Sequence, residues 1–125
     1  MHKRGTQLAH RFELPQATWR SEDWEDLHVS FETYDQHWDS RPLLRGLPND
    51  ECQCPHWGYV LKGSFRAFFG GREEQIRAGE AYYLPPGHTI VMEGGTELIE
   101  WSPRQQFQEH MAAVEELRRR NGTPR

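Results

Sequence analysis

The second half of the 125-residue chain is a series of short alternating segments, and each of them ends near a glycine or a proline. Glycine and proline favour tight turns, so they mark the ends of strands. The predicted strands cover residues 56–61, 64–69, 74–77, 81–84, 89–92 and 97–101. Strands this short and this evenly spaced favour an all-β sandwich or barrel.

The first half of the chain is less regular. Leu27, Val29 and Phe31 alternate with polar residues, and this period of two predicts a strand with one apolar row against a core. Residues 1–25 are polar and irregular, so we expect an N-terminal arm or an early edge strand there. Turn-forming residues across 34–50 indicate a long loop.

A helix is predicted at the C-terminal end of the chain. Ser102 and Gln105 form a capping-box pattern, with Pro103 at the first helical position. The apolar residues that follow fall on one helical face: Phe107, Met111, Val114 and Leu117. The predicted organisation is an arm over 1–25, a barrel over 26–103, a helix over 104–120 that packs on the outside of the barrel or on a second subunit, and a disordered tail over 121–125.

Charge and hydropathy restrict the class of partner. The formal net charge is −4 and there is no basic stripe, which argues against a nucleic-acid surface and against binding to an anionic membrane. No run of about 18 apolar residues exists, and residues 1–10 are basic and polar, so we expect neither a membrane span nor a secretory signal. We therefore expect a cytoplasmic protein whose partner is a small molecule. Thiols stay reduced in that compartment, so the two cysteines need an explanation other than a disulfide framework.

The cysteines stand in a pattern that is typical of metal ligands. Cys52, Cys54 and His56 are spaced by two as the chain enters a predicted strand, so their side chains are expected on one side. Thiolate and neutral imidazole are ligands of zinc and of other borderline or soft ions. His88, in the turn after Pro85-Pro86-Gly87, is the predicted fourth ligand. The other histidines are interpreted as surface residues: His2, His10, His28, His37 and His110.

Simpler interpretations exist for each of these residues. A free cysteine often fills a core, and a histidine in a turn can bond to a backbone carbonyl, as His88 would in that case. A redox pair of Cys52 and Cys54 is disfavoured, because alternate positions of an extended strand hold the sulfurs too far apart for an unstrained disulfide. Two thiols and an imidazole on one strand face would nevertheless form a poor core layer, so the group favours metal binding.

Over Leu27 to Pro103 the sequence resembles the cupin superfamily. Its first motif has two histidines around one residue, then Glu, then a strand that ends in Gly. Counted back from Gly63, His56 falls at the Glu position, and Cys54 and Cys52 fall at the two histidine positions. The second motif has a Gly, then Pro, any residue and Gly, and then a His. Gly79, Pro85 and Gly87 match it, but its usual histidine position is Ile90, two residues after His88.

The resemblance is nearer to a subgroup of small bacterial single-domain cupins, in which a Cys, a Pro-His pair and a Pro-Pro-Gly-His turn recur. Cys52, His56 and His88 look like the typical positions of that subgroup, whereas Cys54 looks like a variable one. The resemblance implies a jelly-roll β-barrel, a metal in its pocket and a homodimer.

The resemblance and the residues together leave three functions open. The first is a metal-dependent enzyme that acts on a small molecule, with zinc or iron(II) as the ion. Its possible lining residues are Tyr59, Tyr82, Tyr83 and Glu100. The second is a non-catalytic module that binds or senses a small ligand or a metal, in which four protein ligands would close the ion instead of three ligands and a water. The third is a structural protein whose cysteines are core filler.

Overall fold

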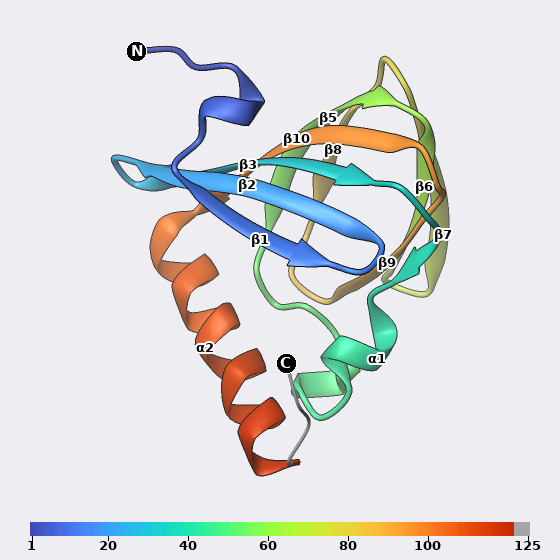
Figure 1. Cartoon of the computed structure of the whole chain (residues 1–125). Coiled ribbons are helices and arrows are strands. Elements are labelled where there is room, and N and C mark those ends of the chain that lie inside the picture. Colours follow the sequence, from blue (N-terminus) through green and yellow to red (C-terminus); the bar gives the residue numbers. More distant parts are fainter. Residues whose placement is uncertain (122–125) are drawn as a thin grey trace.

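In the computed structural model, which describes residues 1–121, two antiparallel β-sheets face one another as a barrel and a C-terminal helix extends from one end (Figure 1). The larger sheet has the order β1 (His10–Leu14), β2 (Ala17–Trp24), β3 (Leu27–Tyr34), β10 (Thr96–Pro103), β5 (His56–Lys62) and β8 (Ala81–Leu84). The smaller sheet has the order β4 (Trp38–Asp39), β9 (His88–Met92), β6 (Ser64–Phe69) and β7 (Arg72–Arg77). The helices are α1 (Arg41–Leu44) and α2 (Arg104–Arg120), and single 3₁₀ turns lie at Gly5–Gln7 and Pro48–Asp50.

The predicted series of strands in the second half is confirmed. All six predicted segments occur, as β5 to β10, and their ends differ from the prediction by two residues at most. The turns between them lie at the expected glycines, several of which adopt a positive φ that other residues rarely adopt. The all-β class with a C-terminal helix is therefore correct.

The N-terminal segment contains an edge strand, the second of the two predicted possibilities, and is not a separate arm. Within residues 1–25, β1 forms the edge of the larger sheet and β2 pairs with both β1 and β3. Glu22 on β2 fixes the position of the residues before β1, because its carboxylate accepts hydrogen bonds from Lys3 Nζ at 2.9 Å and from the Ala9 N–H at 2.8 Å. The same carboxylate accepts a third bond from Trp24 Nε1 at 2.6 Å. The bond from Lys3, followed by that from Trp24, lowers the pKa of Glu22 to about 2.

Strand β3 occurs where it was predicted, but the opposite row of side chains faces the barrel interior. Leu27 is 44% exposed and Phe31 packs against Gly5, whereas Val29 of the same row is buried but does not belong to the main core. The interior row consists of His28, Ser30, Glu32 and Tyr34, all of them buried. The prediction failed because it assumed an apolar barrel interior, and this part of the interior is polar.

Helix α2 has the predicted bounds, but the predicted capping box is absent. Ser102 belongs to β10, and its hydroxyl lies 2.7 Å from His56 Nδ1 inside the barrel. The residue that precedes the helix is Pro103, which makes no side-chain cap. The first helical N–H, that of Arg104, instead donates to the Asp26 carbonyl at 2.8 Å.

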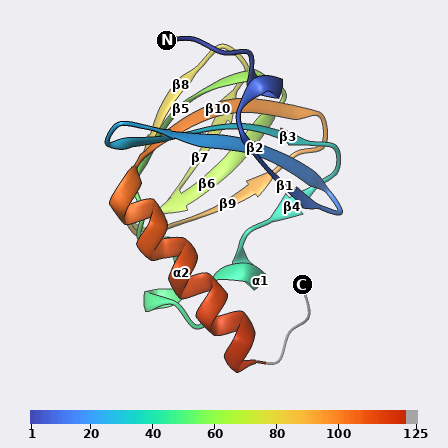
Figure 2. The same cartoon turned by 60° about the vertical axis from the view of Figure 1, so that its left-hand side comes forward.

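Helix α2 leaves the barrel at one end and packs on the segment that contains α1, as Figure 2 shows. Val114 and Leu117 form a small second core there with buried residues of that segment: Leu44, Leu47, Cys52 and Cys54. The predicted packing of the apolar face on the barrel therefore holds only for the start of α2, where Phe107 stacks on His28 of β3, and packing on a second subunit stays a prediction. No helix within residues 1–121 has the length and apolar character needed to cross a membrane. The predicted disordered tail falls, from residue 122 on, outside the described residues.

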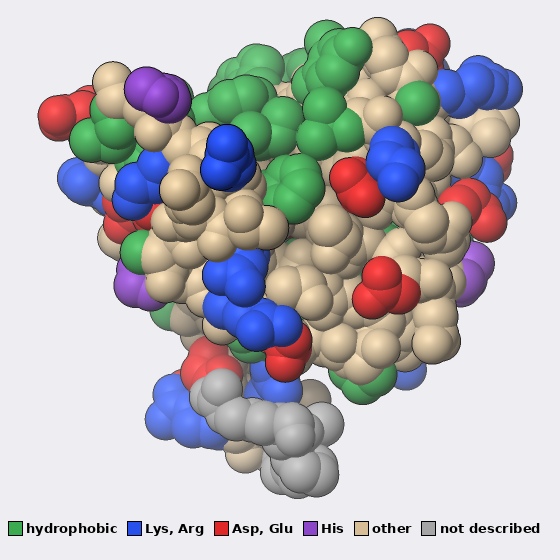
Figure 3. Space-filling model, turned by 45° about the horizontal axis from the view of Figure 1, so that its top comes forward, with side chains coloured by type: hydrophobic (Ala, Val, Ile, Leu, Met, Phe, Trp, Pro, Cys, Tyr) green, Lys and Arg blue, Asp and Glu red, His purple; other side chains and the backbone are tan. Residues whose placement is uncertain are grey.

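The main core fills the other end of the barrel. Its fully buried members come from both sheets and include Val60, Phe65, Leu84, Met92 and Leu98. The face around β5 and β8 carries apolar side chains outside this core, and Figure 3, which looks onto the top of Figure 1, shows hydrophobic groups gathered there. Trp57, Tyr59, Leu61 and Tyr83 are each between 41% and 49% exposed.

We expect Leu98→Ala to destabilise the protein by about 2–5 kcal/mol, because Leu98 is fully buried and its truncation leaves a cavity in the main core. Urea denaturation followed by tryptophan fluorescence measures the free energy of unfolding. The matched control is Leu27→Ala at an exposed position, which should change that free energy by about 0.5 kcal/mol at most. Equal losses in the two variants would contradict this assignment of the core.

Candidate metal centre

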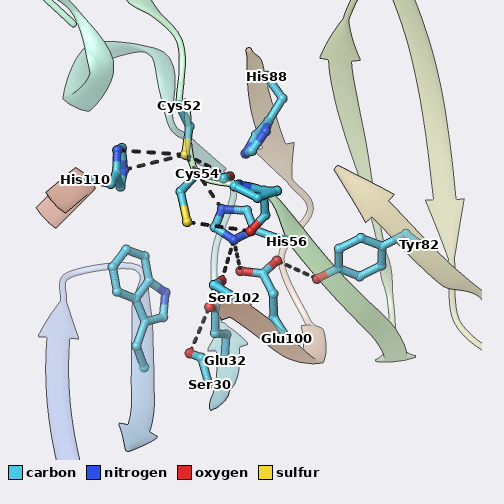
Figure 4. A network of polar contacts seen from close by, with 12 residues as sticks. Ser30, Glu32, Cys52, Cys54, His56, Tyr82, His88, Glu100, Ser102 and His110 are labelled. Atoms are coloured by element: carbon cyan, nitrogen blue, oxygen red, sulfur yellow. Dashed lines mark hydrogen bonds and ion pairs between the residues drawn. The ribbon is translucent and has the colours of Figure 1, made fainter. Parts of the chain in front are cut away.

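Three of the four predicted ligands lie together at the end of the barrel next to α2. Cys52, His56 and His88 are buried, and each offers a ligand atom within 4.8 Å of the ligand atoms of the other two. Cys52 Sγ lies 3.7 Å from His56 Nε2, and the two imidazole rings have centroids 5.0 Å apart (Figure 4). Thiolate and imidazole are the ligand types that zinc and related ions prefer, so the composition of this group fits a transition metal.

A backbone pairing positions these three residues. The Cys52 N–H donates to the His88 carbonyl at 2.9 Å, and the Gly87 N–H donates to the Cys52 carbonyl at 2.8 Å. Gly87 has a φ of 89°, a conformation that suits glycine, and this turns the chain from β8 into His88 at the start of β9. His56 is the first residue of β5. The prediction of three ligands along one strand is therefore wrong, because β5 begins only after the second cysteine.

Cys54 is not among the residues that the structure brings together. It is 1% exposed and lies in the second core with Leu44, Val114 and Leu117. Its Sγ lies 3.6 Å from the Pro55 carbonyl oxygen. The Cys54 thiol also makes a hydrogen bond with Ser102, whose hydroxyl contacts His56, so Cys54 packs beside the candidate ligands without belonging to the group.

The sequence interpretation missed His110 and His28. His110, on α2, has its two ring nitrogens 3.6 Å and 3.9 Å from Cys52 Sγ. His28 is buried, and its ring stacks on Phe107 with centroids 3.9 Å apart. The sequence contained a signal for His110, because it stands three residues after Phe107 and four before Val114, on the apolar face of the predicted helix.

Hydrogen bonds on the far side of each imidazole orient the two histidines. His88 Nδ1 lies 2.7 Å from the Pro85 carbonyl oxygen, which can only accept, so Nδ1 carries the hydrogen and Nε2 keeps its lone pair. His56 Nδ1 lies 2.7 Å from Ser102 Oγ and 3.5 Å from Glu100 Oε2, which leaves Nε2 facing Cys52. Metal-bound histidines are held in this way by a partner at the other nitrogen. The turn hydrogen bond of His88 is thus compatible with ligation.

Burial sets the protonation of the three groups. It lowers the pKa of both His56 and His88 to about 3, so each imidazole is neutral at physiological pH and free to donate a lone pair. Burial also raises the pKa of Cys52 to about 12, so the thiol is protonated when it has no cation beside it. A divalent cation would replace that proton and form the thiolate.

Two buried carboxyl groups lie on the neighbouring strands. Glu100 on β10 accepts a hydrogen bond from the Tyr82 hydroxyl at 2.6 Å. Glu32 on β3 accepts one from the Tyr34 hydroxyl at 2.5 Å and one from Ser30 Oγ at 2.9 Å. Burial raises the pKa of both carboxyls, and the charge of Glu100 raises that of Glu32 further.

These carboxyls and the candidate ligands line one cavity of about 210 Å³. Its aromatic wall consists of Phe12, Trp19, Tyr34, Trp38 and Phe107. Its histidine, cysteine and glutamate residues are His28, Glu32, Cys52, His56, His88, Glu100 and His110. Of the four lining residues predicted from the sequence, Glu100 lines the cavity and Tyr82 is buried beside it, whereas Tyr59 and Tyr83 lie on the outer face.

Known proteins resemble the chain in fold and not in sequence. No protein-family model matches the chain, and no curated protein matches it either. Among solved structures, an RmlC-like cupin from Shewanella frigidimarina shares 17% identity, with 81% of this chain and 87% of that chain covered and a TM-score of 0.58. KdgF from Halomonas sp. shares 20% identity, with 76% and 86% covered and a TM-score of 0.57. A mutant of Bacillus subtilis oxalate decarboxylase shares 18% identity, with 79% of this chain and 28% of that chain covered and a TM-score of 0.54.

The fold is therefore a cupin-type jelly-roll barrel with a C-terminal helix, as the resemblance implied. At these identities the likeness extends to the fold alone. Function has to be argued from the chemistry of the site.

Glu32 is expected to make the stability of the metal-free protein depend on pH. A carboxyl with a raised pKa contributes stability that is fully present below its unfolded pKa and is lost as the pH rises through its folded pKa. For Glu32 this window runs from about 4.5 to about 8. Glu32→Gln should remove at least about 1 kcal/mol of that loss, because one unit of pKa shift corresponds to about 1.4 kcal/mol.

Urea denaturation of chelator-treated wild type and variant across this pH window tests the expectation. Glu73→Gln, the same change at an exposed position on β7, is the matched control and should keep the wild-type profile. Parallel profiles for wild type and Glu32→Gln would mean that Glu32 is ionised at little cost in the folded protein.

Proposed function

We propose that the protein binds one divalent transition metal through Cys52, His56 and His88, and that it is a metal-dependent enzyme acting on a small molecule in the adjoining cavity. The observation that carries the proposal is the group itself: three buried ligand atoms within 4.8 Å of one another, from parts of the chain that only the fold brings together. The thiolate favours zinc, or iron(II) if the chemistry is oxidative.

An open coordination position supports an enzyme over a structural metal site. Structural zinc sites are closed by four protein ligands, whereas catalytic sites have three and leave a position for water or substrate. Within residues 1–121 the mutually close group has three members, and it borders the cavity. A metal ion here would polarise a substrate oxygen or lower the pKa of a water molecule.

The surrounding residues have roles that follow from their contacts. Ser102 and Pro85 orient the two imidazoles, and Glu100 lies close enough to His56 to stabilise a positive charge on the metal site. The Glu100 and Glu32 carboxyls, with raised pKa values, are groups that can hold or release a proton next to the cavity. The aromatic wall excludes water and strengthens these electrostatic effects.

A second candidate function, a non-catalytic metal-binding or sensing module, is favoured by one observation. His110 lies 3.6 Å from Cys52 Sγ, so a small rotation of its side chain would bring a fourth ligand to the ion. A site closed in that way would hold a metal without room for a substrate at the ion. The homodimer that the resemblance implies and the cytoplasmic location remain predictions, as does the third possibility of a purely structural protein, which a metal-free purified sample would favour.

Protein purified without chelator is expected to contain close to one equivalent of transition metal per chain. Cys52→Ala, His56→Ala and His88→Ala should each remove most of it, because two remaining ligands bind a divalent ion weakly. Elemental analysis measures the content and identifies the metal. Cys54→Ala is the matched control and should keep its metal, since its sulfur lies in the second core. Full metal content in the three ligand variants would rule out this site.

The cobalt(II)-substituted protein distinguishes the enzyme from the closed module. If the coordination is open, azide should bind to the ion and change the visible spectrum of both the wild type and His110→Ala. The spectrum should also show a thiolate-to-cobalt charge-transfer band that Cys52→Ala removes. If azide leaves the wild-type spectrum unchanged but alters the His110→Ala spectrum, His110 is the fourth ligand. That result would favour the non-catalytic metal-binding module.

A further inference from the structure

The two carboxyl groups of the cavity keep hydrogen-bond acceptor capacity, while several donors beside them are already paired. The hydroxyls of Ser30 and Tyr34 donate to Glu32, and the Tyr82 hydroxyl donates to Glu100. The Trp19 Nε1–H is also engaged, because it donates to the Tyr34 oxygen at 3.0 Å. Several of the nearby donors are therefore already paired. The carboxylate oxygens, in contrast, can each accept more than one hydrogen bond.

The charge of the cavity has the same bias. Among residues 1–121, none of those that line the cavity is lysine or arginine, whereas Glu32 and Glu100 both line it. A divalent ion bound to the Cys52 thiolate brings a net charge of about +1, which one carboxylate balances. The second carboxyl group has no counter-ion among the described residues, so in the unliganded cavity burial favours its protonated form, as the raised pKa of Glu32 indicates. A ligand with one positive charge would supply the counter-ion and stabilise the carboxylate form.

The walls of the cavity favour a flat apolar body on that ligand. Trp19 and Trp38 meet edge to face with ring centroids 5.9 Å apart, and Phe107 lies on the side of α2. Aromatic rings attract cations as well as flat apolar groups. The volume of about 210 Å³ exceeds the roughly 150 Å³ of a protein cavity that binds benzene, so it accommodates a single ring with a short polar arm.

We propose that the ligand of this cavity is a small organic amine, with a flat apolar body against the tryptophans and a protonated nitrogen that donates hydrogen bonds to Glu32 and Glu100. This inference names the substrate class of the proposed function and rests on it for the ion beside the cavity. A carboxylate or phosphate ligand of the same size is disfavoured, because apart from the ion it would face two acidic side chains and no lysine or arginine.

The test uses three probes that share one ring and differ in the polar group: benzylamine, benzyl alcohol and benzoate. Binding to the protein as purified is followed by tryptophan fluorescence, since Trp19 and Trp38 line the cavity, and by calorimetry. At neutral pH benzylamine should bind about ten-fold or more tightly than benzoate, with benzyl alcohol between them. Benzoate binding as tightly as benzylamine would overturn the proposal.

Glu32→Gln tests whether Glu32 binds the amine without disturbing the metal site, because the hydrogen bonds of Glu32 go to Ser30 and Tyr34 and not to the three proposed metal ligands. This variant should lose about ten-fold in affinity for benzylamine and keep its affinity for benzyl alcohol. Glu73→Gln, the exposed control, should match the wild type. Unchanged benzylamine affinity in a folded Glu32→Gln variant would also overturn the proposal. If that variant does not fold, the comparison of the three probes on the wild type still decides whether the cavity prefers an amine.

Metal content separates the failure of this inference from the failure of the proposed function. The three probes are measured on metal-loaded and on chelator-treated protein, and elemental analysis is done on both. A protein that takes up no metal on loading and still prefers benzylamine would support the amine site and contradict the metal-dependent enzyme. A metal-loaded protein that prefers benzoate would leave the metal site standing and remove the amine ligand.

Discussion

The candidate site depends on the backbone hydrogen bonds that join Cys52 to Gly87 and to His88, the first residue of β9. They link a segment of irregular structure to the end of a strand of the smaller sheet, at distances of 2.8 Å, 2.9 Å and 3.2 Å. Without them nothing in the sheet register would hold the Cys52 thiol against the imidazole of His88. Backbone pairing also gives the loop a fixed position, which a ligand on a flexible segment would lack. The second core, in which Cys52 and Cys54 pack under α2, supports the same segment from its other side.

The polar interior of one end of the barrel has a cost that the rest of the fold must offset. Burying Glu32 and Glu100 is unfavourable, and their hydrogen bonds with Ser30, Tyr34 and Tyr82 reduce that cost. No buried side-chain nitrogen or oxygen in the described residues lacks a partner. Stability therefore comes from the apolar clusters on either side of the cavity, and the cavity itself is available for chemistry. A protein that retains such a destabilising group in its interior usually uses it.

The sequence predicted the architecture well and the site in part, and the difference has a physical origin. The strands β5 to β10 and helix α2 depend on local periodicity and on turn residues, which the sequence contains directly. The direction of the Cys54 side chain depends on where β5 begins, and this depends on the pairing of Cys52 with a residue far along the chain. Ser102 matched a capping box, but its hydroxyl lies against His56 because β10 continues through it. Such tertiary effects have no local signal.

Helix α2 links the two possible functions of the site. It begins at the end of the barrel where the cavity lies, and its Phe107 and His110 both line that cavity. Phe107 is held by its stacking on His28, and His110 by its approach to Cys52. In the proposed metal site, the position of this one helix would determine whether His110 occupies the fourth coordination position or leaves it for a ligand. A bound amine between the tryptophans and the carboxylates would contact the same helix, so ligand binding and metal coordination at this site are expected to be coupled.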